Sequence, residues 1–188
     1  MVIGIDYGSK MAGTTAICFL ENNQFKIVQT KLKEDADAFI HAFIKTHEVS
    51  LVAMDAPLSL PFAFFEKGND YFYRACDRAL SAMSPMFLGG LTARAIKLKK
   101  EIETSNLKFI EVYPSIRGKV LSKEIYKKDK LNIEAYLSIL KENMTHSFIE
   151  EPKNWHQIDA ALALMIGLDY QNGKAESHGM PEEGLIWI

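Results

Sequence analysis

Two short apolar runs that each end at an aspartate constrain the fold of this chain more than any other feature. Val2 to Asp6 and Leu51 to Asp55 are stretches of apolar residues that stop at an acid. Continuous apolar runs of this length are typical of strands that are buried on both faces of a sheet. An ionised carboxylate beside such strands is costly unless it is paired or bound to a metal ion. We therefore expect strand ends that carry acids with a compensating partner.

The remaining periodicity predicts the element order β-β-β-α-β-α-β-α. Further strands are expected at 14–20, 25–30 and 109–113, and helices at 36–44, 71–83, 92–103, 133–142 and 155–170. This order predicts a single three-layer α/β domain over residues 1–188. Its sheet would be mixed and five-stranded, with three antiparallel strands followed by parallel strands and with helices on both faces. Extra helices around 83–105 and 115–150 are interpreted as insertions, and the tail 184–188 is a candidate further strand.

Composition limits the number of domains and the partners. The chain has 188 residues, 48% of them hydrophobic, which is enough for one core and not for a second lobe. A net charge of −2 excludes a global positive field that would hold nucleic acid nonspecifically. Cys18 and Cys76 lack the spacing of a disulfide framework or a zinc site. No secretory leader or membrane span is recognisable, so we expect a cytoplasmic protein without membrane contact.

Four acids that interrupt otherwise apolar elements form the candidate site: Asp6, Asp55, Glu111 and Asp159. If the strands that end in Asp6 and Asp55 are parallel neighbours, these acids meet at the edge where α/β sheets place ligands. Glu111 would join them from the next strand, and Asp159 from a late helix that packs across the strand ends. Clustered carboxylates repel one another, and Mg²⁺ or Mn²⁺ relieves that repulsion. All four acids are predicted to be metal ligands and catalytic residues.

Such a cluster has a known use in hydrolysis. Two ions held roughly 3.5–4 Å apart clamp the attacking and leaving oxygens of a phosphodiester, and one of them activates water. The expected activity is therefore the hydrolysis of nucleic acid, with DNA and RNA not distinguished. His156, three residues before Asp159, is either a proton shuttle or an exposed residue of the first helical turn.

Each acid also has a structural interpretation. Asp6 and Asp55 can simply end a strand and accept hydrogen bonds from the following turn. Asp159 can complement the positive end of its helix. Glu111 has the weakest structural alternative, because glutamate is seldom unpaired inside a buried strand. The joint pattern, and no single acid, favours the metal site.

Basic residues give candidate contacts to a phosphate backbone. Between Thr92 and Lys130, Lys and Arg outnumber Asp and Glu by about two to one, although the whole chain is slightly acidic. This stretch is expected either to follow a phosphate backbone or to form a solvated face. The predicted substrate-binding residues are Lys10, Arg74, Arg117 and Lys119. For Arg74 the alternative is an ion pair with Asp77 on one helix face, and for Lys10 it is a solvated side chain.

The loop 62–73 is rich in aromatic residues, namely Phe62, Phe64, Phe65, Tyr71, Phe72 and Tyr73. Aromatic side chains in such a loop can stack on the bases of a single strand. The alternatives are that they close the core or that they form the contact of a homodimer.

Five short motifs, taken together with their order along the chain, resemble one known family. They are Ile3-Gly4-Ile5-Asp6, Met54-Asp55-Ala56-Pro57-Leu58, Arg74-Ala75-Cys76-Asp77, Glu111-Val112-Tyr113-Pro114-Ser115 and Ile158-Asp159-Ala160-Ala161-Leu162-Ala163. With the ending 180–186 they resemble domain-of-unknown-function family 429, whose members are regarded as predicted nucleases with an RNase H-like fold. The resemblance implies that fold and a Mg²⁺- or Mn²⁺-dependent nuclease. The chain departs from it at 12–15, where members often have a Trp.

Two other functions are compatible with the same residues. The run 4–9, Gly-Ile-Asp-Tyr-Gly-Ser, also resembles the first phosphate loop of actin-like and sugar-kinase-type phosphotransferases. Those ATP-binding enzymes need a second matching lobe, so this chain would be a fragment of one. The other alternative is a non-catalytic RNase H-like binding domain whose acids are structural. Stabilisation by Mn²⁺ would favour the nuclease, and stabilisation by ATP the phosphotransferase.

Overall fold

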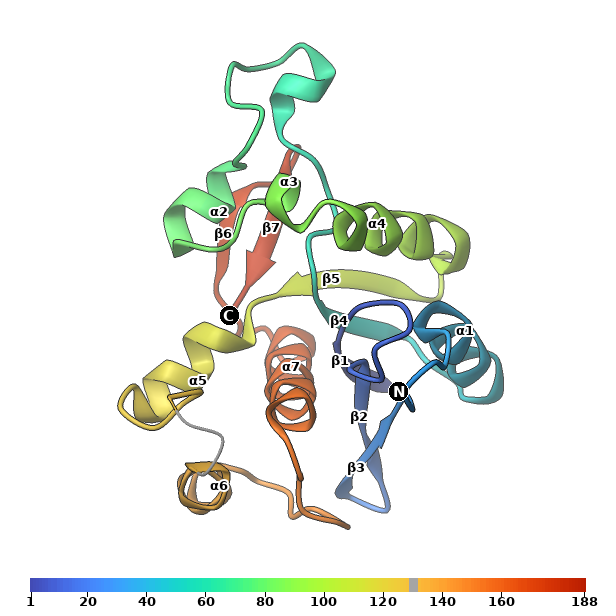
Figure 1. Cartoon of the computed structure of the whole chain (residues 1–188), viewed down its shortest axis with the longest axis vertical. Helices are drawn as coiled ribbons and strands as arrows, with labels where there is room; N and C mark the ends of the chain where they lie inside the picture. The colour runs from blue at the N-terminus through green and yellow to red at the C-terminus, as the bar shows by residue number, and fades with distance from the viewer. Residues whose placement is uncertain (129–131) are drawn as a thin grey trace.

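The computed structural model describes residues 1–128 and 132–188 and places the strands in one mixed sheet (Figure 1). The strands are β1 (Val2–Asp6), β2 (Ala16–Glu21), β3 (Gln24–Gln29), β4 (Leu51–Asp55), β5 (Lys108–Val112), β6 (Ser177–Met180) and β7 (Gly184–Trp187). Their order in the sheet is β3-β2-β1-β4-β5-β7-β6. β1, β2 and β3 form an antiparallel meander, β1, β4, β5 and β7 are parallel, and β6 is antiparallel to β7.

Within residues 1–128 and 132–188 the sheet has seven strands, whereas the sequence pattern predicts five. The tail 184–188 does form a strand, β7, and it pairs with β5 through Glu111 and Val112. The residues before it form β6, so that the chain ends in a hairpin at the edge of the sheet. β6 is mostly exposed and has no alternation of apolar residues. Its sequence therefore does not mark it as a strand.

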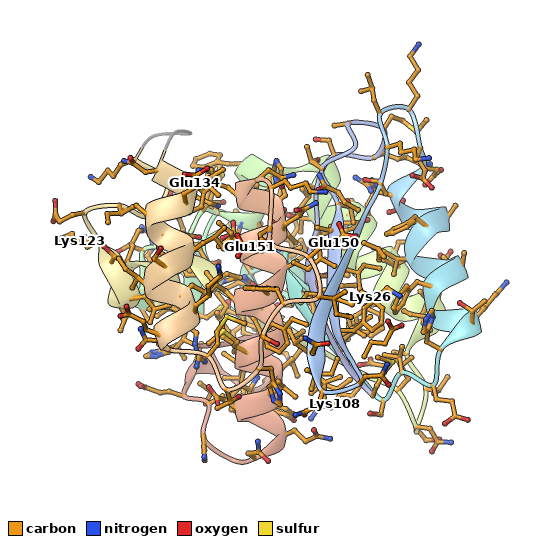
Figure 2. The ribbon with its side chains drawn as sticks, turned by 90° about the horizontal axis from the view of Figure 1, so that it is seen from below. Lys26, Lys108, Lys123, Glu134, Glu150 and Glu151 are labelled. Carbon is orange, nitrogen blue, oxygen red and sulfur yellow. The ribbon has the colours of Figure 1, made fainter. Side chains whose placement is uncertain are left out.

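Helices cover both faces of the sheet. They are α1 (Ala36–Thr46), α2 (Ala75–Leu80), α3 (Pro85–Leu88), α4 (Gly90–Ile102), α5 (Pro114–Ser122), α6 (Ile133–Glu142) and α7 (Trp155–Gln171), with a 3-10 turn at Phe62–Phe65. One apolar layer joins the sheet to α6 and α7, and the other joins it to α1 and α4. Figure 2 shows α7 on one side of the sheet and α1 on the other. Among the described residues, no helix has both the length and the apolarity needed to cross a membrane.

Side chains alternate between these two layers along each strand. Ile3 and Ile5 of β1 pack in the layer of α1 and α4, whereas Val2 packs in the layer of α7. In β4, Val52 and Met54 likewise pack toward α1 and α4. Successive side chains of a strand point to opposite faces of the sheet, so the last residues of these two strands, Asp6 and Asp55, point toward α7. This parity decides which acids share a face.

Glycine lets α7 approach the sheet closely. A β-carbon on Gly4 would lie 2.1 Å from the backbone nitrogen of Leu164 and 2.4 Å from the carbonyl oxygen of Ala160. A β-carbon on Gly167 would lie 2.9 Å from side-chain atoms of both β1 and β4. No side chain fits between β1 and the backbone of α7 at Gly4, because real β-carbons do not approach other atoms this closely. The first turns of α7 therefore reach the ends of β1 and β4.

Candidate metal centre

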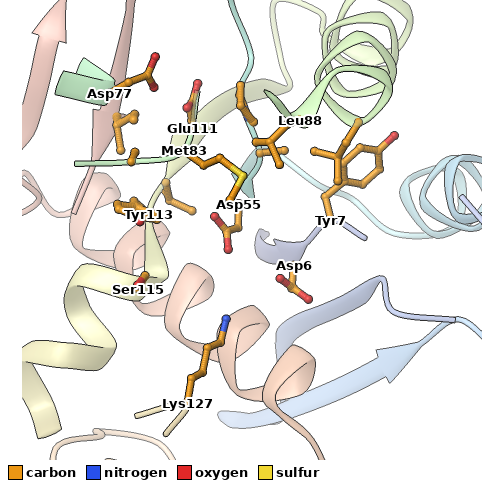
Figure 3. Close-up of a pocket in the computed structure, with 16 residues that line it drawn as sticks. Asp6, Tyr7, Asp55, Asp77, Met83, Leu88, Glu111, Tyr113, Ser115 and Lys127 are labelled. Atoms are coloured by element: carbon orange, nitrogen blue, oxygen red, sulfur yellow. The ribbon is translucent and has the colours of Figure 1, made fainter. Parts of the chain in front are cut away.

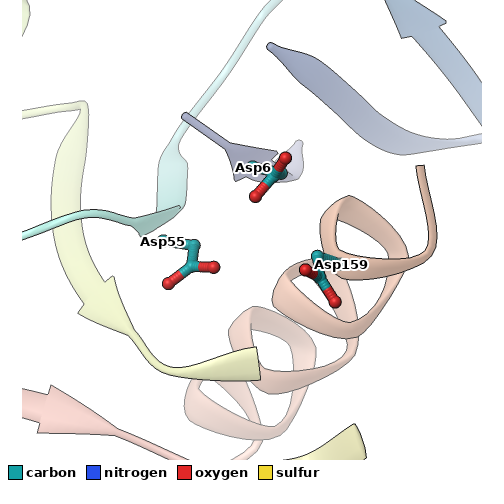
Figure 4. Close-up of side chains that lie close together, drawn as sticks. All are labelled: Asp6, Asp55 and Asp159. Atoms are coloured by element: carbon teal, nitrogen blue, oxygen red, sulfur yellow. The ribbon is translucent and has the colours of Figure 1, made fainter. Parts of the chain in front are cut away.

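Asp6 and Asp55 are direct register partners at the ends of the parallel strands β1 and β4. Asp159, in the second turn of α7, comes to them from the helix layer and is only 1% exposed. One carboxylate oxygen of each of the three residues lies within 4.8 Å of the others (Figure 4). We call Asp6, Asp55 and Asp159 the carboxylate triad. The structure thus brings together three of the four acids that the sequence singles out.

Both oxygens of Asp159 are held by the turn that follows α5. The Tyr126 hydroxyl donates a hydrogen bond of 2.6 Å to Asp159 Oδ1, and the Lys127 ammonium pairs with Asp159 Oδ2. Tyr126 packs directly on α5, where a β-carbon on Gly118 would lie 2.4 Å from its ring. Gly118 therefore makes room for the tyrosine that fixes Asp159. Two consecutive residues orient this carboxylate.

Asp6 has a partner on the open side of the triad. His156, in the first turn of α7, places Nδ1 2.7 Å from Asp6 Oδ2. This hydrogen bond raises the pKa of His156 above its ordinary value, because the carboxylate favours the charged imidazolium. The His156 side chain is 45% exposed, so the ring also reaches solvent.

Burial and mutual repulsion make full ionisation of the triad unfavourable. Burial, followed by the charges of Asp6 and Asp159, raises the pKa of Asp55 well above its ordinary value. Burial also raises the pKa of Asp159 to about 6, helped by Asp6 and opposed by Lys127. The donor set consists of carboxylate oxygens, which hard divalent cations prefer. A Mg²⁺ or Mn²⁺ ion would fit this set, because it would supply positive charge to one buried and two half-buried carboxylates.

Asp6 and Asp55 of the triad line the pocket shown in Figure 3, which has a volume of about 380 Å³. Asp6, Asp55 and Lys127 contribute its polar wall, and Met83 and Leu88 contribute to an apolar wall. Other lining residues come from the first turn of α5 and from the strand ends, including Tyr7, Tyr113 and Ser115. A ligand in this pocket can therefore touch the carboxylates and an apolar surface at the same time.

The prediction that Glu111 joins the other acids needs correction. Glu111 pairs in register with Met54, one residue before Asp55, and its neighbours Ile110 and Val112 pack toward α7. By alternation its side chain leaves the sheet on the opposite face from Asp55. There it accepts hydrogen bonds of 2.6 and 2.7 Å from Arg74 and one of 2.8 Å from the Leu58 backbone. Glu111 is thus the partner of a buried arginine, and lies outside the triad.

The prediction that Arg74 contacts substrate also needs correction, because Arg74 is bound to Glu111 and its neighbours. Its guanidinium donates two hydrogen bonds to Asp77, two to Glu111 and one to Ser59. These use all five of the N–H donors that an arginine side chain has. Arg74 is 1% exposed. It therefore offers no donor to a phosphate and holds α2 against β5.

The other predicted substrate-binding residues lie away from the pocket walls. Lys10 pairs with Asp35 at 3.2 Å, and Arg117 pairs with Asp169 of α7 at 2.5 Å. Lys119 is exposed on α5. None of these three lines the pocket, whereas Lys127 does. Lys130, the last residue of the basic stretch, is outside the described residues.

Tyr126 and Lys127 are the members of the site that the sequence pattern does not assign to it. Lys127 stands out only as one of several basic residues, and nothing in the sequence singles out Tyr126 as a partner of Asp159. Their positions depend on how the turn after α5 folds. A local periodicity does not encode such a turn.

Comparison with known proteins gives no identification of this chain. No protein-family model, no curated protein and no solved structure matches it.

Proposed function

We propose that this chain is a Mg²⁺- or Mn²⁺-dependent nuclease with an RNase H-like fold, similar to domain-of-unknown-function family 429. The observation that carries the proposal is the convergence of Asp6, Asp55 and Asp159 from three separate segments, with ligand oxygens within 4.8 Å of one another. The position of the triad supports it as well. The carboxyl ends of adjacent parallel strands are where α/β proteins place their ligands.

The residues of the triad would hold the cation, and their neighbours prepare them for it. When bound, such an ion polarises a phosphodiester and lowers the pKa of a coordinated water. Tyr126 fixes Asp159, and His156 fixes Asp6, so two of the three ligands are oriented by hydrogen bonds. His156 also reaches solvent, which makes its other ring nitrogen, Nε2, a candidate to accept a proton from water.

The direction of α5 supports a polymeric anionic substrate. Ser115 in the first turn of α5 lines the pocket, and the exposed residues Lys119 and Lys123 follow along and after the helix. A chain of phosphates that enters the pocket would meet these ammonium groups as it leaves. Contacts of this kind hold a backbone through its charge and do not read the bases.

The test is a cleavage assay on a panel of linear, single-stranded and branched DNA and RNA. We expect cleavage in Mg²⁺ or Mn²⁺, none in EDTA, and none in Asp6→Asn or Asp55→Asn. Asp70→Asn is the matched control, because Asp70 is an exposed acid that pairs with Arg78 outside the pocket. Cleavage that persists in Asp55→Asn would contradict the proposal. Protection from unfolding by ATP and not by Mn²⁺ would favour the phosphotransferase alternative, and protection by neither the binding domain.

A further inference from the structure

Lys127 occupies an unusual position for a lysine. Its ammonium pairs with Asp159 Oδ2, and it lines the same pocket as Asp6 and Asp55. Figure 3 shows the side chain rising from the turn after α5 toward those two carboxylates. Among the described residues, Lys127 and His156 are the basic side chains that contact the triad. The Lys127 ammonium therefore lies beside the point where the three carboxylates converge.

The two oxygens of Asp159 have different partners, and one partner can move away from the carboxylate more easily than the other. Oδ1 accepts from Tyr126, which is buried and packs its ring against Tyr136 and Trp155. Oδ2 pairs with Lys127, whose side chain is 45% exposed and is attached to a flexible stem. Whichever oxygen Asp159 offers to an ion, one of these partners is already there. The lysine is the partner that can move into solvent.

We propose that Lys127 is the built-in counter-ion of the carboxylate triad and that a divalent cation binds by displacing its ammonium from Asp159. This inference rests on the cation site proposed above. An ammonium and a divalent cation on the same carboxylate repel each other, so the lysine lowers the affinity of the triad for metal. In return it neutralises part of the charge of the triad. Burial by itself would lower the pKa of Lys127, but Asp159 more than reverses this, which keeps the side chain charged.

The backbone of Lys127 is also specialised for this position. Its φ angle is 55°, in the left-handed region that residues other than glycine seldom adopt. From this turn Tyr126 and Lys127, which are adjacent in sequence, contact the two oxygens of Asp159.

The experiment is a calorimetric titration of Mn²⁺ into the unmodified protein and three variants. Lys127→Gln removes the charge, Lys127→Arg keeps it, and Lys128→Gln removes the same charge from the next residue, which does not line the pocket. We expect Lys127→Gln to bind Mn²⁺ about tenfold more tightly than the unmodified protein, because the ion no longer has to displace an ammonium from Asp159. Lys127→Arg and Lys128→Gln should bind within about twofold of it.

Thermal unfolding gives a second readout that does not depend on catalysis. In EDTA, Lys127→Gln should unfold at a lower temperature than the unmodified protein, and added Mn²⁺ should raise its Tm by more. Equal Mn²⁺ affinity in Lys127→Gln and the unmodified protein, or weaker binding by the variant, would overturn the inference and leave the proposed function standing. Asp55→Asn should abolish Mn²⁺ binding. If none of these proteins binds Mn²⁺, or if Asp55→Asn binds it as well as the unmodified protein does, the triad is not a cation site and both proposals are wrong.

Discussion

Arg74 and Glu111 form a buried two-point ion pair, with Nη1 2.7 Å from Oε2 and Nη2 2.6 Å from Oε1. The pair joins the start of α2 to β5 on the face of the sheet opposite to Asp55. Burial raises the pKa of Glu111 above its ordinary value, although Arg74 favours the ionised form. Glu111 is therefore a structural residue that also lines the pocket, and its removal should lower stability more than it weakens metal binding.

Glu111→Ala should lower the free energy of unfolding by about 3–5 kcal/mol, because it removes one of the two carboxylates that pair with a buried arginine. Urea unfolding in EDTA measures this change. Lys97→Ala, which removes an exposed ion pair with Glu101, is the control and should have little effect. A Glu111→Ala protein of normal stability that had lost Mn²⁺ binding would place Glu111 among the ligands after all.

Gly4→Ala should destabilise the fold by about 3 kcal/mol, at the upper end of overpacking effects, because the new methyl group meets the backbone of α7. The shift of α7 should also weaken Mn²⁺ binding, since Asp159 moves with the helix. Gly90→Ala is the matched control, because a β-carbon there meets nothing within 4 Å. Unfolding by urea and titration with Mn²⁺ check the two effects. Equal behaviour of the two variants would refute the close approach of α7 to β1.

Asp55→Asn should stabilise the protein in EDTA while it abolishes stabilisation by Mn²⁺. The neutral amide removes a buried charge that Asp6 and Asp159 repel. The free energy of unfolding in EDTA should therefore be higher for the variant than for the unmodified protein. Thermal unfolding with and without Mn²⁺ measures both effects. A loss of stability in EDTA would indicate that Asp55 has a structural role in the strand end.

The protein in EDTA should become more stable as the pH is lowered from about 7 to about 4. The folded chain holds a proton on Asp159 with a pKa of about 6, and the unfolded chain holds it only near the ordinary value of 3.8. The folded state therefore binds more protons in this range, so stability is lost as the pH rises through 6. His156 acts in the same direction, because its pKa is also raised. A series of Tm values checks this, and saturating Mg²⁺ should remove the trend.

Much of the candidate site can be predicted from the sequence because strand parity is regular. The runs that end at Asp6 and Asp55 are short and apolar, so their last residues meet once the strands are parallel neighbours. Asp159 follows from the same logic, since a helix of small apolar residues must cover the sheet closely. These three positions can be predicted because each depends on a local pattern of apolar residues in the sequence.

The position of Glu111 could not be predicted, because it depends on the register between β4 and β5. A shift of one residue moves a side chain to the other face, and the long connection between the two strands does not fix it. Neither could β6 or the contacts of Tyr126 and Lys127 be predicted, because they depend on the tertiary folding of short segments that have no local pattern. The RNase H-like assignment and the nuclease activity remain proposals that rest on the motifs and the triad.

The central claim is that Asp6, Asp55 and Asp159 jointly bind a divalent cation. Anomalous diffraction from crystals soaked in Mn²⁺ tests it most directly. The account predicts an anomalous peak bounded by the three carboxylates, with the Lys127 ammonium withdrawn from Asp159, and no peak there in Asp55→Asn crystals. A structure with no peak between these carboxylates, or with the three side chains pointing to separate regions, would contradict it.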